Sequence, residues 1–223
     1  ERVQALFEAV SGARLMHNYF RIGGLKDDVP DGFVPATRVL LDQLKAGYDE
    51  AKNILTESEV FIERTAGVGA ISGEQALDFG VSGPVLRASG IDYDVRKNFP
   101  YSVYPELDFT VPVGKHGDCY DRYMVRMLEI EQSLSIIEQA LDKLPEGPIQ
   151  SRVQRIIRPE AGDVYVNGEN PRGDLGVYIV SVGHHATPYR LKIRGPSFCN
   201  LMALATMMRG SYIADATVIL GSL

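Results

Sequence analysis

One short segment gathers side chains that could do chemistry. Residues 11–24 read SGARLMHNYFRIGG and place Arg14, Met16, His17 and Arg21 where a predicted helix gives way to a glycine turn. Guanidinium and imidazole groups supply positive charge and hydrogen-bond donors. Packing alone does not require such a combination, so we single out the segment as a candidate site.

A second segment, residues 189–198, reads YRLKIRGPSF. Side chains alternate across a strand, so Arg190, Lys192 and Arg194 fall on one face, and a helix N-terminus follows. The face is a candidate cationic site. The alternative is a solvent-facing edge strand, whose charged residues discourage aggregation.

The other signals are weaker. The glycines at 67, 69 and 73 have GxGxxxG spacing without regular strand–helix alternation, which favours a tight turn over a dinucleotide loop. His184 and His185 lie in a predicted turn with no third metal ligand nearby. Cys119 and Cys199, 80 residues apart, are expected to be reduced, buried thiols rather than a disulfide. Two cysteines alone cannot hold an iron–sulfur cluster or a structural zinc.

Four carboxylates, Asp92, Asp94, Glu106 and Asp108, flank aromatic residues. They could form a paired-carboxylate site, but an ion-paired or solvated loop is favoured.

Composition excludes two classes. The chain of 223 residues has 23 basic and 29 acidic side chains, and a net charge of −6 is not the footprint of a nucleic-acid binder. No apolar run approaches the roughly 18 residues that a membrane span needs. Any work at a membrane would depend on other subunits.

Periodicity predicts the elements that must position these side chains. Asp118 is the expected N-cap of the strongest helix, whose apolar residues at 120, 124, 127, 130, 134, 137, 141 and 144 predict a bundle seam. Residues 81–114 are expected to be irregular and extended. Helices are predicted at 1–16, 33–55, 73–79, 118–144, 198–208 (capped by Ser197 or Asn200) and from about 212, with strands at 60–62, 163–167, 175–182 and 189–194.

We therefore expect an α+β, mainly α fold, a helical bundle with a small antiparallel sheet. The chain is predicted to be part of one domain, 1–223, with a helical portion at 1–148 and a β-hairpin and terminal helices at 159–223.

Five phrases in order carry a family resemblance: SGARLMHNYFRIGG, LRASGIDYDVRKNFPYS, GDCYDRYMVRMLEIEQSLSIIEQAL, RGDLGVYIVS and PYRLKIRGPSF. They resemble the 49 kDa (D-type) subunits of respiratory complex I, a family that is similar to the large subunit of nickel–iron hydrogenases. The resemblance implies a hydrogenase large-subunit-like fold with one side facing quinone.

The resemblance also implies a function. Such a chain is a peripheral subunit on the cytoplasmic side of a membrane complex that translocates protons and oxidises NADH, ferredoxin or a deazaflavin. It passes electrons from the terminal iron–sulfur cluster of a B-type subunit to quinone, and it also meets C-type and membrane-arm subunits. It binds no cofactor or metal itself.

Arg14, Met16, His17, Arg21, Lys192 and Arg194 match cluster-facing or quinone-chamber positions of the family. The family's quinone-contacting histidine and tyrosine would precede Glu1, so the chain is expected to be an inactive C-terminal piece without catalytic residues of its own.

The sequence departs from the family at two places. Many members have a histidine where Met16 stands, and that histidine takes up a proton when the cluster is reduced. Methionine cannot titrate, so a lower and less pH-dependent cluster potential is expected unless His17 substitutes. The link between Pro148 and Pro159 is also shorter than in many members, as in archaeal relatives.

Two rival interpretations remain open. A hydrogenase-like large subunit would need paired CxxC motifs, and none occurs in these residues. A catalytically silent assembly or scaffold member of the family is the other.

Overall fold

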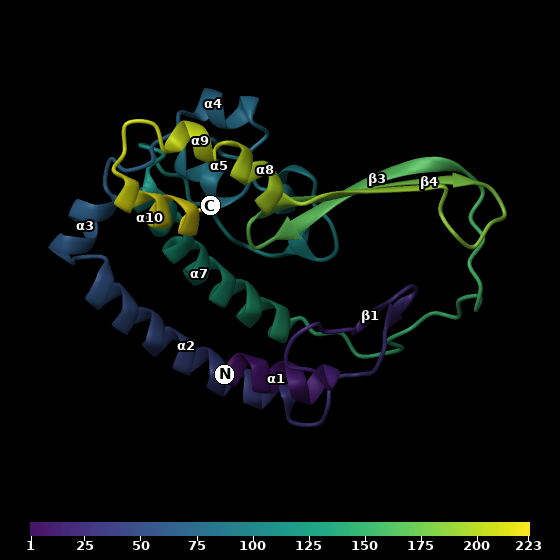
Figure 1. Ribbon diagram of the computed structural model, residues 1–223. Coiled ribbons are helices and arrows are strands. Elements are labelled where there is room, and N and C mark those ends of the chain that lie inside the picture. Colours follow the sequence, from purple (N-terminus) through teal and green to yellow (C-terminus); the bar gives the residue numbers. More distant parts are fainter.

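The computed structural model describes residues 1–223. A helical body carries a sheet that projects from it, and a small hairpin lies beside the first helix (Figure 1). The helices are α1 (Arg2–Ser11), α2 (Phe33–Leu55), α3 (Glu59–Thr65), α4 (Gly73–Asp78), α5 (Pro84–Ala88), α6 (Val95–Asn98), α7 (Cys119–Asp142), α8 (Pro196–Met202), α9 (Leu204–Met207) and α10 (Ala216–Gly221), with 3₁₀ turns η1 (Tyr104–Glu106) and η2 (Ile213–Asp215). The strands are β1 (Phe20–Arg21), β2 (Gly24–Leu25), β3 (Ala161–Asn170), β4 (Gly173–Val182) and β5 (Arg190–Arg194).

The two long helices, α2 and α7, run side by side along the body (Figure 1). The bounds predicted for α2 are confirmed. Asp118 caps α7 as predicted, because its carboxylate accepts a hydrogen bond of 2.8 Å from the Asp121 N–H. An ion pair of 2.6 Å between Arg38 and Asp142 joins the two helices.

The apolar seam predicted along α7 is only partly buried. Met127 and Leu134 are buried, whereas Ile130 and Ile137 remain 43% and 37% exposed. The buried side of α7 also carries Arg122, whose guanidinium donates to the carbonyl of Gly69 before α4. The prediction of an apolar seam therefore overlooked a buried polar residue on the same helix.

The core lies where the short helices meet the start of α7. Residues 81–89 are all buried, and they include α5. The expectation of an extended, irregular segment over 81–114 was wrong for this part, because Gly83 and Pro84 open a short helix rather than only breaking one. The core residues are Ile71, Ala76, Val81, Val85, Leu86, Cys119, Ala203, Met207, Ile219 and Leu223.

Three element predictions need correction. The first helix ends at Ser11, since Gly12 adopts a left-handed conformation with φ of 78°. The predicted strand at 60–62 is inside α3, because the Ser58 side chain caps a helix there despite the β-branched residues.

The predicted helix at 198–208 is also wrong in detail. It is divided into α8 and α9, and Gly195 precedes Pro196 at the first helical position. Neither Ser197 nor Asn200 caps it; the Asn200 side chain is fully buried and bonds to Ser82 N and Arg172 O instead.

The last third confirms the predicted antiparallel strands. Strand order is β3-β4-β5, and Val164, Ile179 and Leu191 pair in one row across the sheet. The observed α+β, mainly α architecture with a small antiparallel sheet is the predicted fold class. None of the helices is both long and apolar enough to cross a membrane.

Candidate functional site

The predicted cationic segment, 11–24, lies on the surface between α1 and β2. Arg14 forms an exposed ion pair of 2.7 Å with Glu8. The ring of His17 packs on Phe7, with 4.8 Å between ring centroids, and His17 Nδ1 lies 3.2 Å from the hydroxyl of Ser11. These contacts hold the Arg14 and His17 side chains against the end of α1.

Met16 and Arg21 complete this segment. Met16 is 91% exposed and has a positive φ of 37°. Arg21 lies on β1 and donates hydrogen bonds to the Asn18 side chain and the Phe20 carbonyl. All four predicted residues of the segment are therefore exposed on one short stretch of chain.

The glycine turn of this segment is fastened to the link that follows α7. Leu25 N donates to Ile149 O at 3.0 Å, and Ser151 N donates to Gly23 O at 2.9 Å. A Cβ on Gly24 would lie 2.1 Å from Ile149 O, so only glycine allows this approach. The conformation of the cationic segment thus depends on residues far along the sequence.

The second predicted group lies on the edge strand β5. Lys192 is exposed and pairs with Tyr178 in the sheet register. Arg194 instead donates to Gly80 O at 2.6 Å and to Asp174 O at 2.9 Å, so it ties the sheet to the body. No hydrogen bond or ion pair joins this group to the 11–24 segment, and the two remain separate sites.

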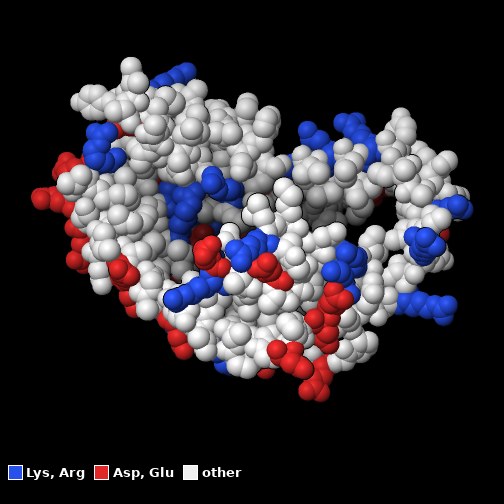
Figure 2. Space-filling model, turned by 60° about the horizontal axis from the view of Figure 1, so that its bottom comes forward, with Lys and Arg blue, Asp and Glu red and all other residues white.

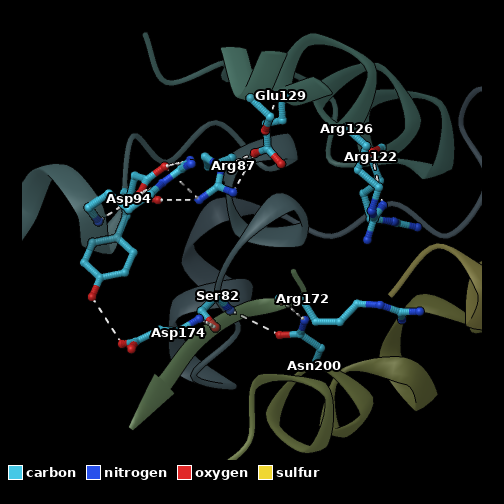
Figure 3. Close-up of polar contacts among 12 residues, drawn as sticks. Ser82, Arg87, Asp94, Arg122, Arg126, Glu129, Arg172, Asp174 and Asn200 are labelled. Atoms are coloured by element: carbon cyan, nitrogen blue, oxygen red, sulfur yellow. Dashed lines mark hydrogen bonds and ion pairs between the residues drawn. The ribbon is translucent and has the colours of Figure 1, made fainter. Parts of the chain in front are cut away.

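The sequence analysis missed a buried ionic network centred on Arg87. Its side chain is 1% exposed and lies between α5 and α7 (Figure 3). Its Nε donates to Glu129 at 2.6 Å, and its Nη1 donates to Tyr93 O at 3.0 Å and lies 3.9 Å from Asp94. A charge this deeply buried requires such partners.

Asp94 extends the network towards Arg96. The guanidinium of Arg96 donates to both carboxylate oxygens of Asp94, at 3.0 and 2.6 Å. Burial acts to raise the pKa of Asp94, but these hydrogen bonds and the charge of Arg96 outweigh it, so the pKa lies below its usual range. Of the four carboxylates singled out, Asp94 alone is buried, and it confirms the ion-paired alternative.

Glu169, at the end of β3, lies near this network beside an open groove of about 430 Å³. Burial, and next the charge of Asp94, raise the pKa of Glu169 to about 7. Arg96, Arg126, Glu129 and Ser133 also line the groove. The groove therefore contains a carboxyl group able to take up a proton near neutral pH.

One signal could have revealed this network. Arg122, Arg126 and Glu129 follow a four- and three-residue spacing on α7, beside the apolar seam. Charged residues at helical spacing along a predicted buried face require internal partners. The partner of Glu129, Arg87 on α5, comes from a distant part of the sequence and could not be assigned.

The weaker signals have structural explanations. Gly69 allows close packing, because a Cβ there would lie 2.7 Å from the side chain of Ile219. His184 and His185 lie in the exposed turn between β4 and β5. Cys119 is buried, Cys199 is half-buried, and both are free thiols.

The comparisons with known proteins agree with the family resemblance of the motifs. The family model described as respiratory-chain NADH dehydrogenase, 49 Kd subunit, matches residues 1–223. The chain belongs to this 49 kDa subunit family.

Relatives named as D subunits of NADH-quinone oxidoreductase are similar over the whole chain. Identity is 47% to the protein of Desulforamulus reducens, and the match covers 100% of the chain and 61% of that protein. It is 48% to the protein of Clostridium beijerinckii, with 100% and 60% covered, and 46% to a D subunit of a Roseiflexus species, with 100% and 62% covered. The chain thus spans about three fifths of the length of these 49 kDa family members.

Proposed function

We propose that this chain forms part of the quinone-site subunit of a complex I-type oxidoreductase. In this role it helps electrons pass from the terminal iron–sulfur cluster of a partner subunit to quinone, in a complex that translocates protons. The observation that carries the proposal is the family match over all 223 residues, motif segments included. The names of its relatives, which are NADH-quinone oxidoreductase subunits, describe the same reaction class.

The exposed cations give this proposal a chemical basis. Arg14, His17 and Arg21 face outwards from one stretch of chain, where a partner's reduced cluster would gain from positive charge and N–H donors. Lys192 offers a second exposed ammonium group for a reduced quinone or a partner carboxylate. Arg194 has its donors occupied within the chain, so we assign it a positioning role on β5.

The partners follow from the same proposal. A cluster-bearing B-type subunit, a C-type subunit and the membrane-arm subunits would surround the protein on the cytoplasmic side of the membrane. Purification through a tag on the complete gene product is expected to recover these subunits together, and recovery of a lone chain that reduces no quinone would contradict this assignment.

The first test measures quinone reduction by the whole complex. Arg14→Gln removes a charge that is 60% exposed and held only by Glu8, so folding should persist while electron transfer slows by about tenfold. Lys192→Gln should reduce the rate to a smaller extent. The matched control is Arg2→Gln, an exposed arginine on α1 outside both sites. Rates for Arg14→Gln equal to those of this control would count against the proposed role.

A further inference from the structure

Arg122 is a fully buried cation without an acidic partner. Its exposure is 0%, and its guanidinium donates to Gly117 O at 2.7 Å, Gly69 O at 3.0 Å and the Ser222 hydroxyl at 2.8 Å. It also lies 3.1 Å from the sulfur of Cys119. All these partners are formally neutral groups, so the guanidinium is hydrogen-bonded but has no negatively charged partner.

Arg126, one helical turn later, is half-buried and also lacks an acidic partner. Its hydrogen bond within the chain goes to the Arg122 carbonyl at 3.1 Å, and no carboxylate lies within ion-pair distance. Burial, and next the charges of Arg172 and Arg122, lower the pKa of Arg126 to about 10.

Arg172 approaches these residues from the turn between β3 and β4. Its guanidinium donates to the main-chain oxygen of Leu223 and forms no ion pair with an aspartate or glutamate. In Figure 3, Arg122 and Arg126 lie together on α7, and the side chain of Arg172 extends past Asn200 on the facing side. Figure 2 shows basic side chains, with acidic ones beside them, around a central hollow of the surface.

Three of the neighbouring carboxylates already have partners. Glu129 pairs with Arg87 at 2.5 Å, and Asp94 pairs with Arg96. Asp118 accepts from the main-chain N–H groups of Gly67 and Asp121. Glu169 lines the groove beside Arg126, but no ion pair joins the two. The three arginines therefore hold an excess of positive charge.

We propose that Arg126 and Arg172, supported by Arg122, bind one carboxylate between them. The planar fork of a guanidinium matches a carboxylate in a bidentate arrangement. Arg172 lies close enough to Arg126 for its charge to act on that group, so one anion between them would offset both charges. A cavity of about 260 Å³ adjoins Arg126 and is walled by Phe61, Tyr123 and Val218. Its apolar walls leave room for the carbon atoms that carry the carboxylate.

The test compares unfolding midpoints of the complete gene product. If a carboxylate bridges the two arginines, Arg126→Gln and Arg172→Gln should each lower the midpoint by about 5 °C. The double variant should fall no further than the lower of the two, because both residues bind one group. Arg126→Lys keeps the charge but loses the fork, and should be intermediate. The matched control, Arg209→Gln, changes an exposed arginine outside the cluster and should stay within about 1 °C of the wild type.

Two salt titrations at equal ionic strength identify the source of the carboxylate. If it is a free small anion, acetate raises the wild-type midpoint above its value in chloride, and Arg126→Gln abolishes the rise. If it belongs to a peptide segment, acetate has no effect, while the two single variants still lose stability without adding.

A site that holds no anion predicts a different result. Without a bound anion, Arg126→Gln removes a repelled, half-buried charge and should leave the midpoint unchanged or raise it. That outcome, or losses that add fully in the double variant without any acetate effect, would overturn the proposal.

Discussion

Glu169 carries a carboxyl group whose charge state changes near neutral pH. Its ordinary pKa of 4.5 is raised to about 7 in the folded protein. The folded state therefore binds a proton more tightly than the unfolded state, and stability falls as pH rises from about 4.5 to 7. The shift corresponds to about 3 kcal/mol, and screening by solvent at this partly exposed group reduces the expected loss to about 2 kcal/mol above pH 7.

Glu169→Gln should remove this dependence. We expect the variant to match the wild type at pH 4 and to exceed its free energy of unfolding at pH 8 by about 2 kcal/mol in urea titrations. Glu160→Gln, at an exposed carboxylate, serves as the control. Equal pH profiles for the wild type and Glu169→Gln would show that the carboxyl group is not held in a protonated state.

Met16 allows a second prediction at this scale, which rests on the proposed function. A methionine cannot take up a proton when the partner's cluster is reduced, so the cluster potential should vary with pH by much less than about 59 mV per unit. Redox titrations of the whole complex between pH 6 and 8 measure this slope. Met16→His should raise the potential and steepen the slope.

His17 is the internal control for that measurement. Its ring is already packed on Phe7 and lies within hydrogen-bond distance of Ser11. A steep slope in the wild type that disappears in His17→Gln would transfer the role to this neighbour, and a steep slope unchanged by either substitution would reject the idea.

Among the elements, α7 depends on the turn that precedes it. Gly117 has a φ of +66°, and a Cβ there would lie 2.1 Å from Ile71 O. Gly117→Ala should therefore cost at least about 2 kcal/mol of stability. Gly47→Ala, on the exposed side of α2, meets nothing within 4 Å and should stabilise the helix by about 0.5–1 kcal/mol. Chemical denaturation of the pair measures both signs, and equal effects would contradict the assigned role of the turn.

The elements also show what sequence periodicity can predict. Long elements with a regular pattern, such as α2, α7 and the strands β4 and β5, lie where the pattern indicates. The short helix α5 was missed because its five residues are buried on all sides and have no amphipathic period. The strand expected at 60–62 was wrong because a serine cap outweighs β-branched residues in so short a stretch.

At the scale of the whole molecule, the candidate sites also divide into those that local sequence patterns predict and those that only folding brings together. The cations of the 11–24 segment and β5 could be named from the sequence because they follow local patterns. The network of Arg87, Asp94 and Glu129 could not, since its members come from α5, the start of α6 and α7 and are joined only by folding.

The whole molecule also joins distant segments at Gly24. Gly24→Ala should separate the glycine turn from Ile149 and thereby speed amide hydrogen exchange at Leu25 and Ser151. Exchange in α7 should be unaffected. Unchanged exchange at Leu25 and Ser151 would mean that this attachment does not hold the turn.

That attachment makes the chain between α7 and β3 a positional constraint on the glycine turn. Residues 149–151 are hydrogen-bonded to the glycine turn. The length of the chain between α7 and β3 therefore limits where the side chains of Arg14, His17 and Arg21 can lie relative to the sheet. A family member with a longer connection would be free to present the same side chains at another angle without changing a single charged residue.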